Sequence, residues 1–186
     1  MTAGFFSTLV PALAILVPFA GTLVILISRR SAARWLCVAA SAISLLFCLL
    51  SMKSCWMNGM EGVTTPLLHL GSVTVFGFTV DRVSSLLATA FVGIGMLVTV
   101  YATAYLDEGN KEHPDKHRKR FYAVFCAFIG AMAGVVFSST ILGQLVFFEI
   151  TGACSWALIG YYNTPASQKA AMKALVITHL ASLGLY

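Results

Sequence analysis

Apolar runs of about 20 residues recur along this chain, and they restrict its fold more than any other feature. A helical run of this length matches the hydrocarbon thickness of a bilayer. The runs are continuous rather than alternating, which favours helices over the strands of a closed barrel. We therefore expect an all-α, polytopic transmembrane helix bundle, with helices at about 5–27, 35–52, 83–106, 121–138, 141–162 and 170–186.

The composition agrees with a chain that lies in a bilayer. Hydrophobic residues make up 59% of it and charged residues only 10%, whereas soluble domains are roughly 25% charged. We expect one membrane domain over 1–186, interrupted by two segments that are too polar to span. In 53–80, SVTVFGFTV alternates as a short hairpin at the extracytoplasmic interface would, and 107–120, DEGNKEHPDKHRKR, is a charged cytoplasmic loop.

The positions of the Lys and Arg residues predict the topology, because positively charged loops stay on the cytoplasmic side. With an extracytoplasmic N-terminus, only Lys53 and Arg82 lie outside. The net charge of +5 therefore mainly reflects topology, and for the basic loop we favour contact with anionic lipid headgroups over nucleic-acid binding. The other ten Lys and Arg residues then lie on the cytoplasmic side: Arg29, Arg30, Arg34, Lys111, Lys116, Arg118, Lys119, Arg120, Lys169 and Lys173.

Glu149 stands in the middle of an apolar run, LVFFEITGACSW. Eight residues into its helix, it lies roughly 12 Å below the outer end. A carboxylate at this depth must be protonated, paired or hydrated, and such residues commonly belong to proton or ion paths. Gly152, Trp156 and Gly160 share its helical face and leave room for a neighbouring helix or water. The alternative is a permanently protonated carboxyl with a structural hydrogen bond.

The next helix brings two more candidates for a proton relay, because it runs antiparallel to the helix of Glu149. His179 is expected at nearly the depth of Glu149, and imidazole can pass a proton through either ring nitrogen. A structural interhelical hydrogen bond is an equally good interpretation of His179. Lys173 lies nearer the cytoplasmic end, where its amine can reach the interface. Six residues separate Lys173 from His179, so the two do not share one helical face.

The remaining polar residues favour structural roles. Asp81 and Arg82 open a helix at the outer interface, where an acid caps a helix start, although an interfacial ion pair is the other possibility. The cysteines show no CxxC spacing, so we interpret those inside apolar segments as core residues rather than metal ligands. No catalytic, metal-binding or cofactor-binding motif is visible in the sequence. Any redox chemistry is therefore expected in other subunits.

Several blocks of this sequence occur together in one known family. They are VDRVSSLL with IGMLVTVYATAYL, RFYAVFCAFIGAMAG, ILGQLVFFEITGACSWALIGYY and AAMKALVITHLASLGLY, and they cover the chain from about residue 80. On these blocks the chain resembles the antiporter-like membrane subunits of respiratory complex I, of multisubunit cation/proton antiporters and of energy-converting hydrogenases. Within these blocks, the segments FFEITGACSWALI and THLASLGLY look most like the D component of the bacterial formate-linked hydrogenase of type four.

The resemblance implies a proton-translocating subunit of about fourteen helices in a bacterial inner membrane. In this family a glutamate on helix five, here Glu149, pairs with a lysine on helix seven. The lysine that many members carry on helix six falls on Lys173, and the polar position deeper in that helix falls on His179. Because this sequence ends within helix six, we expect it to be the N-terminal part of a longer subunit.

The resemblance also defines the expected partners. They are other subunits of a hydrogenase or NADH dehydrogenase-like complex, with nickel, iron–sulfur clusters or flavin held only by those partners. Redox chemistry there would drive proton movement here. The main alternative is a cation (Na⁺)/proton antiporter subunit that needs no redox partner, and a third possibility is a membrane scaffold.

Overall fold

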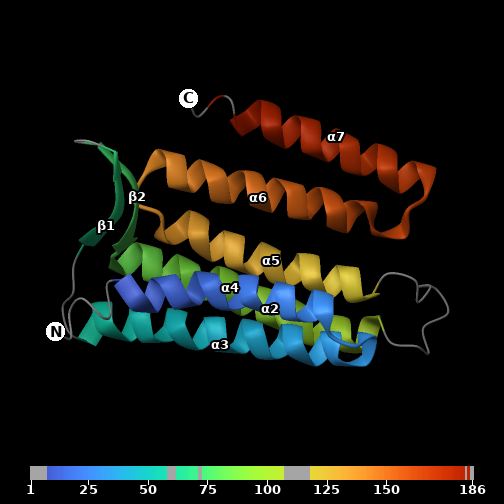
Figure 1. Ribbon diagram of the computed structural model, residues 1–186, viewed down its shortest axis with the longest axis horizontal. Coiled ribbons are helices and arrows are strands. Elements are labelled where there is room, and N and C mark those ends of the chain that lie inside the picture. The colour runs from blue at the N-terminus through green and yellow to red at the C-terminus, as the bar shows by residue number, and fades with distance from the viewer. Residues whose placement is uncertain (1–7, 58–61, 71–72, 107–117, 183, 185–186) are drawn as a thin grey trace.

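The computed structural model describes residues 8–57, 62–70, 73–106, 118–182 and 184. Figure 1 shows its helices side by side along the long axis, with a β-hairpin at one end. Five helices are long and apolar enough to cross a membrane, which confirms the predicted transmembrane bundle. The described elements are α2 (Val10–Ile27), α3 (Arg30–Met57), β1 (Val63–Leu70), β2 (Val73–Val80), α4 (Arg82–Tyr105), α5 (Arg118–Phe137), α6 (Ile141–Ile159), the 3-10 turn η3 (Gly160–Tyr162) and α7 (Pro165–Ser182).

Element boundaries on the N-terminal side differ from the expectation, and α3 begins at Arg30 rather than near residue 35. The helix α3 continues to Met57 instead of ending near residue 52, because Ser54 and Cys55 beyond the apolar run are buried in the bundle. The motif SVTVFGFTV is not a whole hairpin. Its residues from Val73 onward form only β2, which pairs antiparallel with β1.

The last helix, α7, also differs from the expectation. It begins at Pro165 rather than near residue 170. Thr164 and Ser167 explain the early start, since Thr164 Oγ1 accepts the Ser167 N–H at 3.1 Å and Ser167 Oγ accepts the Thr164 N–H at 2.9 Å. This reciprocal cap, followed by proline at the first helical position, is a standard helix start. The helix α7 is not among the five that are apolar enough to span.

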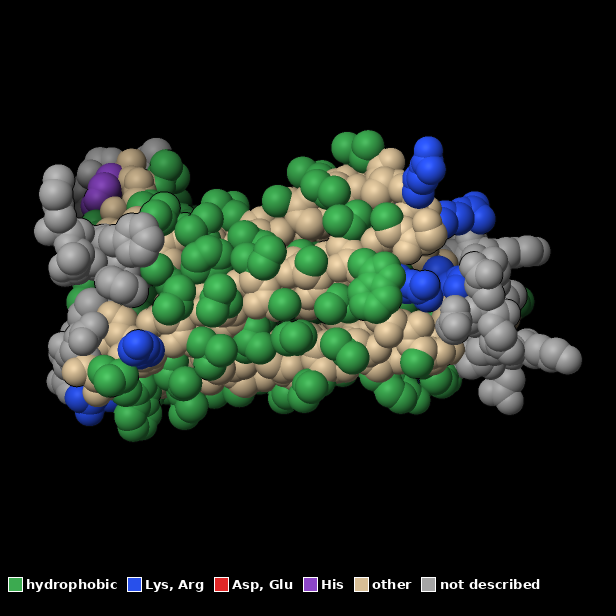
Figure 2. Space-filling view, turned by 90° about the horizontal axis from the view of Figure 1, so that it is seen from below, with side chains coloured by type: hydrophobic (Ala, Val, Ile, Leu, Met, Phe, Trp, Pro, Cys, Tyr) green, Lys and Arg blue, Asp and Glu red, His purple; other side chains and the backbone are tan. Residues whose placement is uncertain are grey.

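The charged loop expected at 107–120 lies mostly outside the described residues. Its last residues, Arg118 to Arg120, form the first turn of α5. Figure 2 shows an apolar middle flanked by Lys and Arg at the ends of the molecule. This distribution is typical of a helix bundle that crosses a bilayer.

Helix α5 packs against α2, α3, α4 and α6, and small residues let it approach them closely. A side chain at Gly130 would meet the Ile15 carbonyl and the Pro18 ring of α2, both at 3.1 Å, and one at Gly134 would collide with the ring of Phe147 in α6. The GAMAG motif therefore allows close packing against two different helices, through Gly130 against α2 and through Gly134 against α6.

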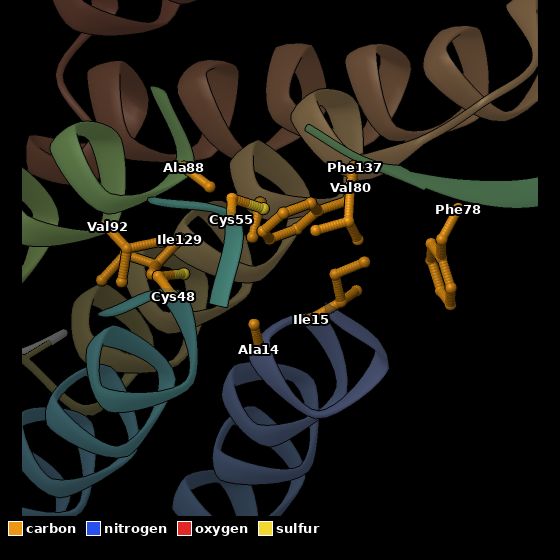
Figure 3. Close-up of a cluster of buried hydrophobic side chains, with 11 residues drawn as sticks. Ala14, Ile15, Cys48, Cys55, Phe78, Val80, Ala88, Val92, Ile129 and Phe137 are labelled. Atoms are coloured by element: carbon orange, nitrogen blue, oxygen red, sulfur yellow. The ribbon is translucent and has the colours of Figure 1, made fainter. Parts of the chain in front are cut away.

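Polar groups inside the bundle are paired where a proline interrupts the helical hydrogen bonds. Pro18 lacks an N–H, so the carbonyl of Ala14 has no partner four residues on. The hydroxyl of Ser44 in α3 donates to that carbonyl at 2.6 Å. Figure 3 shows the apolar core, to which α2 contributes Ala14 and Ile15 and α3 contributes Cys48. All five cysteines are buried, as their interpretation as core residues predicts.

Candidate functional site

The hairpin and the turn after α5 fix the start of α6. Thr140 is the N-cap of α6, and its Oγ1 accepts the Gly143 N–H at 3.1 Å and donates to the Val75 carbonyl of β2 at 2.9 Å. In the same turn, the Ser139 N–H donates to the Gly77 carbonyl at 2.9 Å. These bonds anchor the helix about two turns above Glu149.

Helix α7 lies along the outer side of α6, at the edge of the bundle (Figure 1). Two glycines lie at this contact, Gly152 on α6 and Gly160 in η3. A side chain at Gly152 would lie 3.8 Å from His179, and one at Gly160 would lie 3.6 Å from Ala171. The face predicted to leave room for a neighbouring helix therefore receives α7.

The structure brings Glu149 and His179 into direct contact. Glu149 Oε2 lies 2.7 Å from His179 Nε2, with 32% of the glutamate side chain and 48% of the histidine side chain exposed. The expectation of similar depth is met, although α7 starts earlier than expected. Ser182, one turn beyond His179, adds a third group, because its Oγ lies 2.7 Å from Glu149 Oε1.

The second ring nitrogen of His179 determines how protons are arranged in this cluster. His179 Nδ1 lies 3.0 Å from the carbonyl oxygen of Leu175. A carbonyl only accepts hydrogen bonds, so Nδ1 carries a hydrogen. The 2.7 Å contact between Nε2 and Oε2 then needs one proton between these two atoms, since otherwise two lone pairs would face each other. The pair is therefore neutral overall, as an ion pair or as imidazole with carboxylic acid.

Ser182 gives the cluster room for a further proton. Its hydroxyl lies 2.7 Å from Glu149 Oε1 and 2.8 Å from the carbonyl oxygen of His179. When Oε1 is unprotonated, the hydroxyl donates to it. When Oε1 is protonated, Oε1 donates to Ser182 Oγ and the serine hydroxyl turns to the His179 carbonyl. Every donor has an acceptor in both states. The cluster can therefore accommodate one further proton when the Ser182 hydroxyl rotates.

The other predicted residues lie away from this cluster. Lys173 is exposed on α7, about 9 Å along the helix from His179, and no contact with Glu149 or His179 is found within the described part of the chain. Asp81 caps α4, accepting the Ser84 N–H at 2.6 Å, while Ser84 Oγ accepts the Asp81 N–H at 2.9 Å. Arg82 begins α4, which packs chiefly against α3 and α5.

Two features of the site were not predicted. Ser182 stands at i+3 from His179, a spacing that places both side chains on one face and could have identified it. Trp156, on the Glu149 face, has an indole N–H that is buried without a hydrogen-bond partner among the described residues. Among these residues, no group of three or more His, Cys, Asp or Glu could hold a metal ion.

Comparisons with known proteins agree with this architecture. A family model described as the N-terminus of chain 5 of NADH-ubiquinone oxidoreductase (complex I) matches residues 68–122. The NAD(P)H-quinone oxidoreductase chain 5 of Picosynechococcus sp. is 34% identical over 110 residues, which is 59% of this chain and 16% of the relative. A component of a probable K⁺/H⁺ antiporter of Rhizobium meliloti is 34% identical over 182 residues, which is 92% of this chain and 17% of the relative.

A solved structure has the same fold. A chain of the membrane-bound sulfane sulfur reductase, an archaeal respiratory membrane complex, superposes with a TM-score of 0.73 at 17% sequence identity. The superposition covers 94% of this chain and 34% of that one. This chain thus spans about a sixth of the length of the two curated relatives, at 16% and 17%.

Proposed function

Because this chain is similar to chain 5 of complex I-type enzymes and to a cation/proton antiporter subunit, we propose that it is part of a proton-translocating, antiporter-like subunit in which Glu149 and His179 carry the proton. The observation that carries the proposal is the 2.7 Å contact between Glu149 Oε2 and His179 Nε2. It joins two titratable groups across α6 and α7 at a depth where unpaired charges are costly.

The mechanism follows from the proton positions in this cluster. In the resting state one proton lies between Glu149 Oε2 and His179 Nε2. A second proton arrives at Glu149 Oε1, and Ser182 accepts the resulting O–H while its own hydroxyl turns to the His179 carbonyl. The neutralised carboxyl then holds the imidazolium less strongly, so the cluster releases one proton and returns to its resting state, with one proton between Glu149 Oε2 and His179 Nε2. An approaching or retreating cation from another part of the protein would bias this exchange.

In this proposal Lys173 lies at the cytoplasmic end of the proton path, not beside Glu149 and His179. Its distance of about 9 Å from His179 along α7 is too long for direct transfer, so one or more waters must connect them. Trp156 lies about 10 Å along α6 from Glu149, and its indole N–H is buried without a hydrogen-bond partner among the described residues. A buried donor of this kind is satisfied by a water molecule, and the two residues would thus bracket a hydrated passage.

The driving force comes from partner subunits in this proposal. The chain sits in a bacterial inner membrane with its N-terminus outside, as a component of a multisubunit redox complex. Nickel, iron–sulfur clusters or flavin belong to the partners, and the complex is either a formate-linked hydrogenase or an NADH dehydrogenase-like enzyme. Coupling then works by shifting the protonation equilibrium of Glu149 and His179.

A component of a cation/proton antiporter is the second candidate function. The relative named as part of a probable K⁺/H⁺ antiporter aligns with 92% of this chain, which favours this candidate over a scaffold. The two candidates differ in their energy source. Sodium- or potassium-dependent proton exchange in vesicles without any redox substrate would identify the antiporter, whereas proton movement that requires the redox reaction would identify the redox-driven complex.

The test of the proton path replaces Glu149 in the full-length protein within its native assembly. Glu149→Gln keeps the shape and removes the titratable group, so we expect proton movement in sealed vesicles to fall to background while the assembly stays intact. His179→Gln should have the same effect. His69→Gln is the matched control, because His69 lies exposed in β1, away from the cluster. Normal pumping by Glu149→Gln would overturn the proposal.

A further inference from the structure

A partly open apolar cavity of about 210 Å³ lies between α4 and α5, away from the Glu149 cluster. Apolar cavities of about 150 Å³ already stay dry and bind small hydrocarbons. The volume of this cavity is too small for a partner helix, whose diameter is about 10 Å. It can therefore take a chain of methylene groups or a single side chain. Its principal lining residues are Phe91, Ile94, Val98, Phe125, Phe128 and Met132.

Two stripes of residues lead from the cavity to the end of the molecule where α5 begins. On α4, the series Phe91, Ile94 and Val98 continues with the same 3–4 spacing to Tyr101 and Tyr105. The two tyrosine rings stack at 5.4 Å and are 65% and 42% exposed. Tyrosines at such positions are typical of the membrane interface, where the ring meets lipid esters and headgroups.

The stripe on α5 runs beside the first one and ends in positive charge. From Phe128 and Phe125 it continues with the same spacing to Phe121 and Arg118. The rings of Phe121 and Phe125 stack at 5.7 Å, and those of Phe125 and Phe128 at 6.1 Å. Arg118, Lys119 and Arg120 form the first turn of α5, where the positive end of the helix dipole also lies.

Depth and charge together define the ligand. The lining residues of α5 lie about 10 to 21 Å from its first residue, which is the depth of acyl chains in the adjacent leaflet. Between these lining residues and the first turn of α5 lie the aromatic rings of Tyr101, Tyr105 and Phe121. The cationic side chains of that first turn come last. An amphipathic molecule that fits this order has a long apolar chain, a polar linkage and an anionic head.

We propose that the groove between α4 and α5 binds an anionic phospholipid, with one acyl chain in the cavity, its ester region beside Tyr101 and Tyr105, and its phosphate at the first turn of α5. Each Lys or Arg near an anionic headgroup contributes roughly fivefold to the affinity. Lys119 and Arg120 together are thus expected to favour an anionic over a zwitterionic lipid by about thirtyfold.

The test uses the full-length protein in its purified complex, reconstituted with phosphatidylglycerol that carries a photoreactive diazirine in the acyl chain. We expect crosslinked peptides from the Phe91–Val98 and Phe125–Met132 segments. The same probe with a choline headgroup should label them at least tenfold less at limiting concentration. Lys119→Gln with Arg120→Gln should remove this headgroup preference, and Val98→Trp, which fills the cavity, should abolish the labelling.

Matched controls separate a built site from general lipid contact. Arg29→Gln with Arg30→Gln removes two exposed charges elsewhere in the chain, and Val100→Trp adds the same indole on another face of α4. Neither should change the labelling. Equal labelling by both headgroups, or labelling that survives Val98→Trp, would overturn the proposal. Complete protection of both segments in the assembled complex would also overturn it, because a protein chain would then fill the groove.

Discussion

At the scale of single residues, the cluster of Glu149, His179 and Ser182 solves the problem of placing a titratable carboxyl in a membrane helix. A lone carboxylate there would cost several kcal/mol. The contact with His179 shares one proton between two groups and leaves no net charge. Ser182 then makes a second proton tolerable, since its hydroxyl accepts or donates as the state of Glu149 requires.

Ser182→Ala tests the role of this hydroxyl. The variant leaves the Glu149 and His179 contact in place but removes the acceptor for a proton on Oε1. A hydrogen bond between neutral groups is worth about 0.5–1.5 kcal/mol, so we expect proton movement to slow by up to about tenfold. The protonated carboxyl band of Glu149 in infrared difference spectra should move to higher frequency.

Ser155→Ala is the control for that experiment. Ser155 is half-buried, whereas Ser182 is buried, and the Ser155 hydroxyl donates to the Thr151 carbonyl of its own helix at 2.9 Å. It should therefore leave both the rate and the infrared band unchanged. Equal rates for Ser182→Ala and the parent protein would show that the second proton does not use Oε1.

For single residues, the sequence predicted the similar depth of Glu149 and His179 but not the contact between them. Glu149 was recognisable as a charge in an apolar run, and antiparallel helices with a short connection put His179 at its level. The direct contact could not be predicted, because it depends on the rotation of α7 about its axis. That rotation becomes visible only in the packed bundle, where α7 meets Gly152 of α6 and Gly160 of η3 at ordinary van der Waals distances.

At the scale of elements, close packing between α5 and α6 positions the site. The absence of a side chain at Gly134 lets Phe147 of α6 lie directly against α5. Phe147 stands two residues before Glu149, and its ring also lies 6.1 Å from that of Phe76 in β2. A disturbance at Gly134 would therefore reach both the hairpin and the helix that carries Glu149.

Gly134→Ala should destabilise the protein for this reason. Overpacking of this kind costs about 1–3 kcal/mol, partly offset by the better helix propensity of alanine, about 1 kcal/mol. We expect a lower Tm in detergent. Gly93→Ala is the matched control, since its new Cβ would lie 3.7 Å from Leu45 Cδ1, an ordinary contact, so its Tm should stay the same or rise. A Gly134→Ala protein as stable as Gly93→Ala would contradict the packing argument.

The hairpin shows why element boundaries were harder to predict than helices. Strand β2 alternates clearly, but β1 contains Pro66 and the adjacent pair Leu67 and Leu68, and its register is irregular between Pro66 and His69. This irregularity hides the period of two on which strand prediction depends. The β2 strand is held by the turn between α5 and α6 as much as by β1, through bonds to Ser139 and Thr140. Such long-range partners are invisible in a local pattern.

At the scale of the whole molecule, the two ends differ in charge. Helices α3, α5 and α7 begin at one end, and their first turns and flanks carry most of the described Lys and Arg residues, whereas Lys53 and Arg82 lie at the hairpin end. Lys111 and Lys116 fall outside the described residues. The prediction that the basic end faces the cytoplasm follows from this asymmetry.

Site-directed labelling tests this orientation, and the native cysteines make it practical because all five are buried. In intact cells, His69→Cys in the hairpin should react with a membrane-impermeant maleimide, since the hairpin is predicted to face outward. Lys119→Cys, at the start of α5, should react only after the cells are made permeable, and the parent protein should react in neither case. The reverse pattern would place the basic end outside. Lys173 lies between His179 and that end, so protons entering by way of Lys173 would then come from outside the cell, and the direction of the proposed path depends on this result.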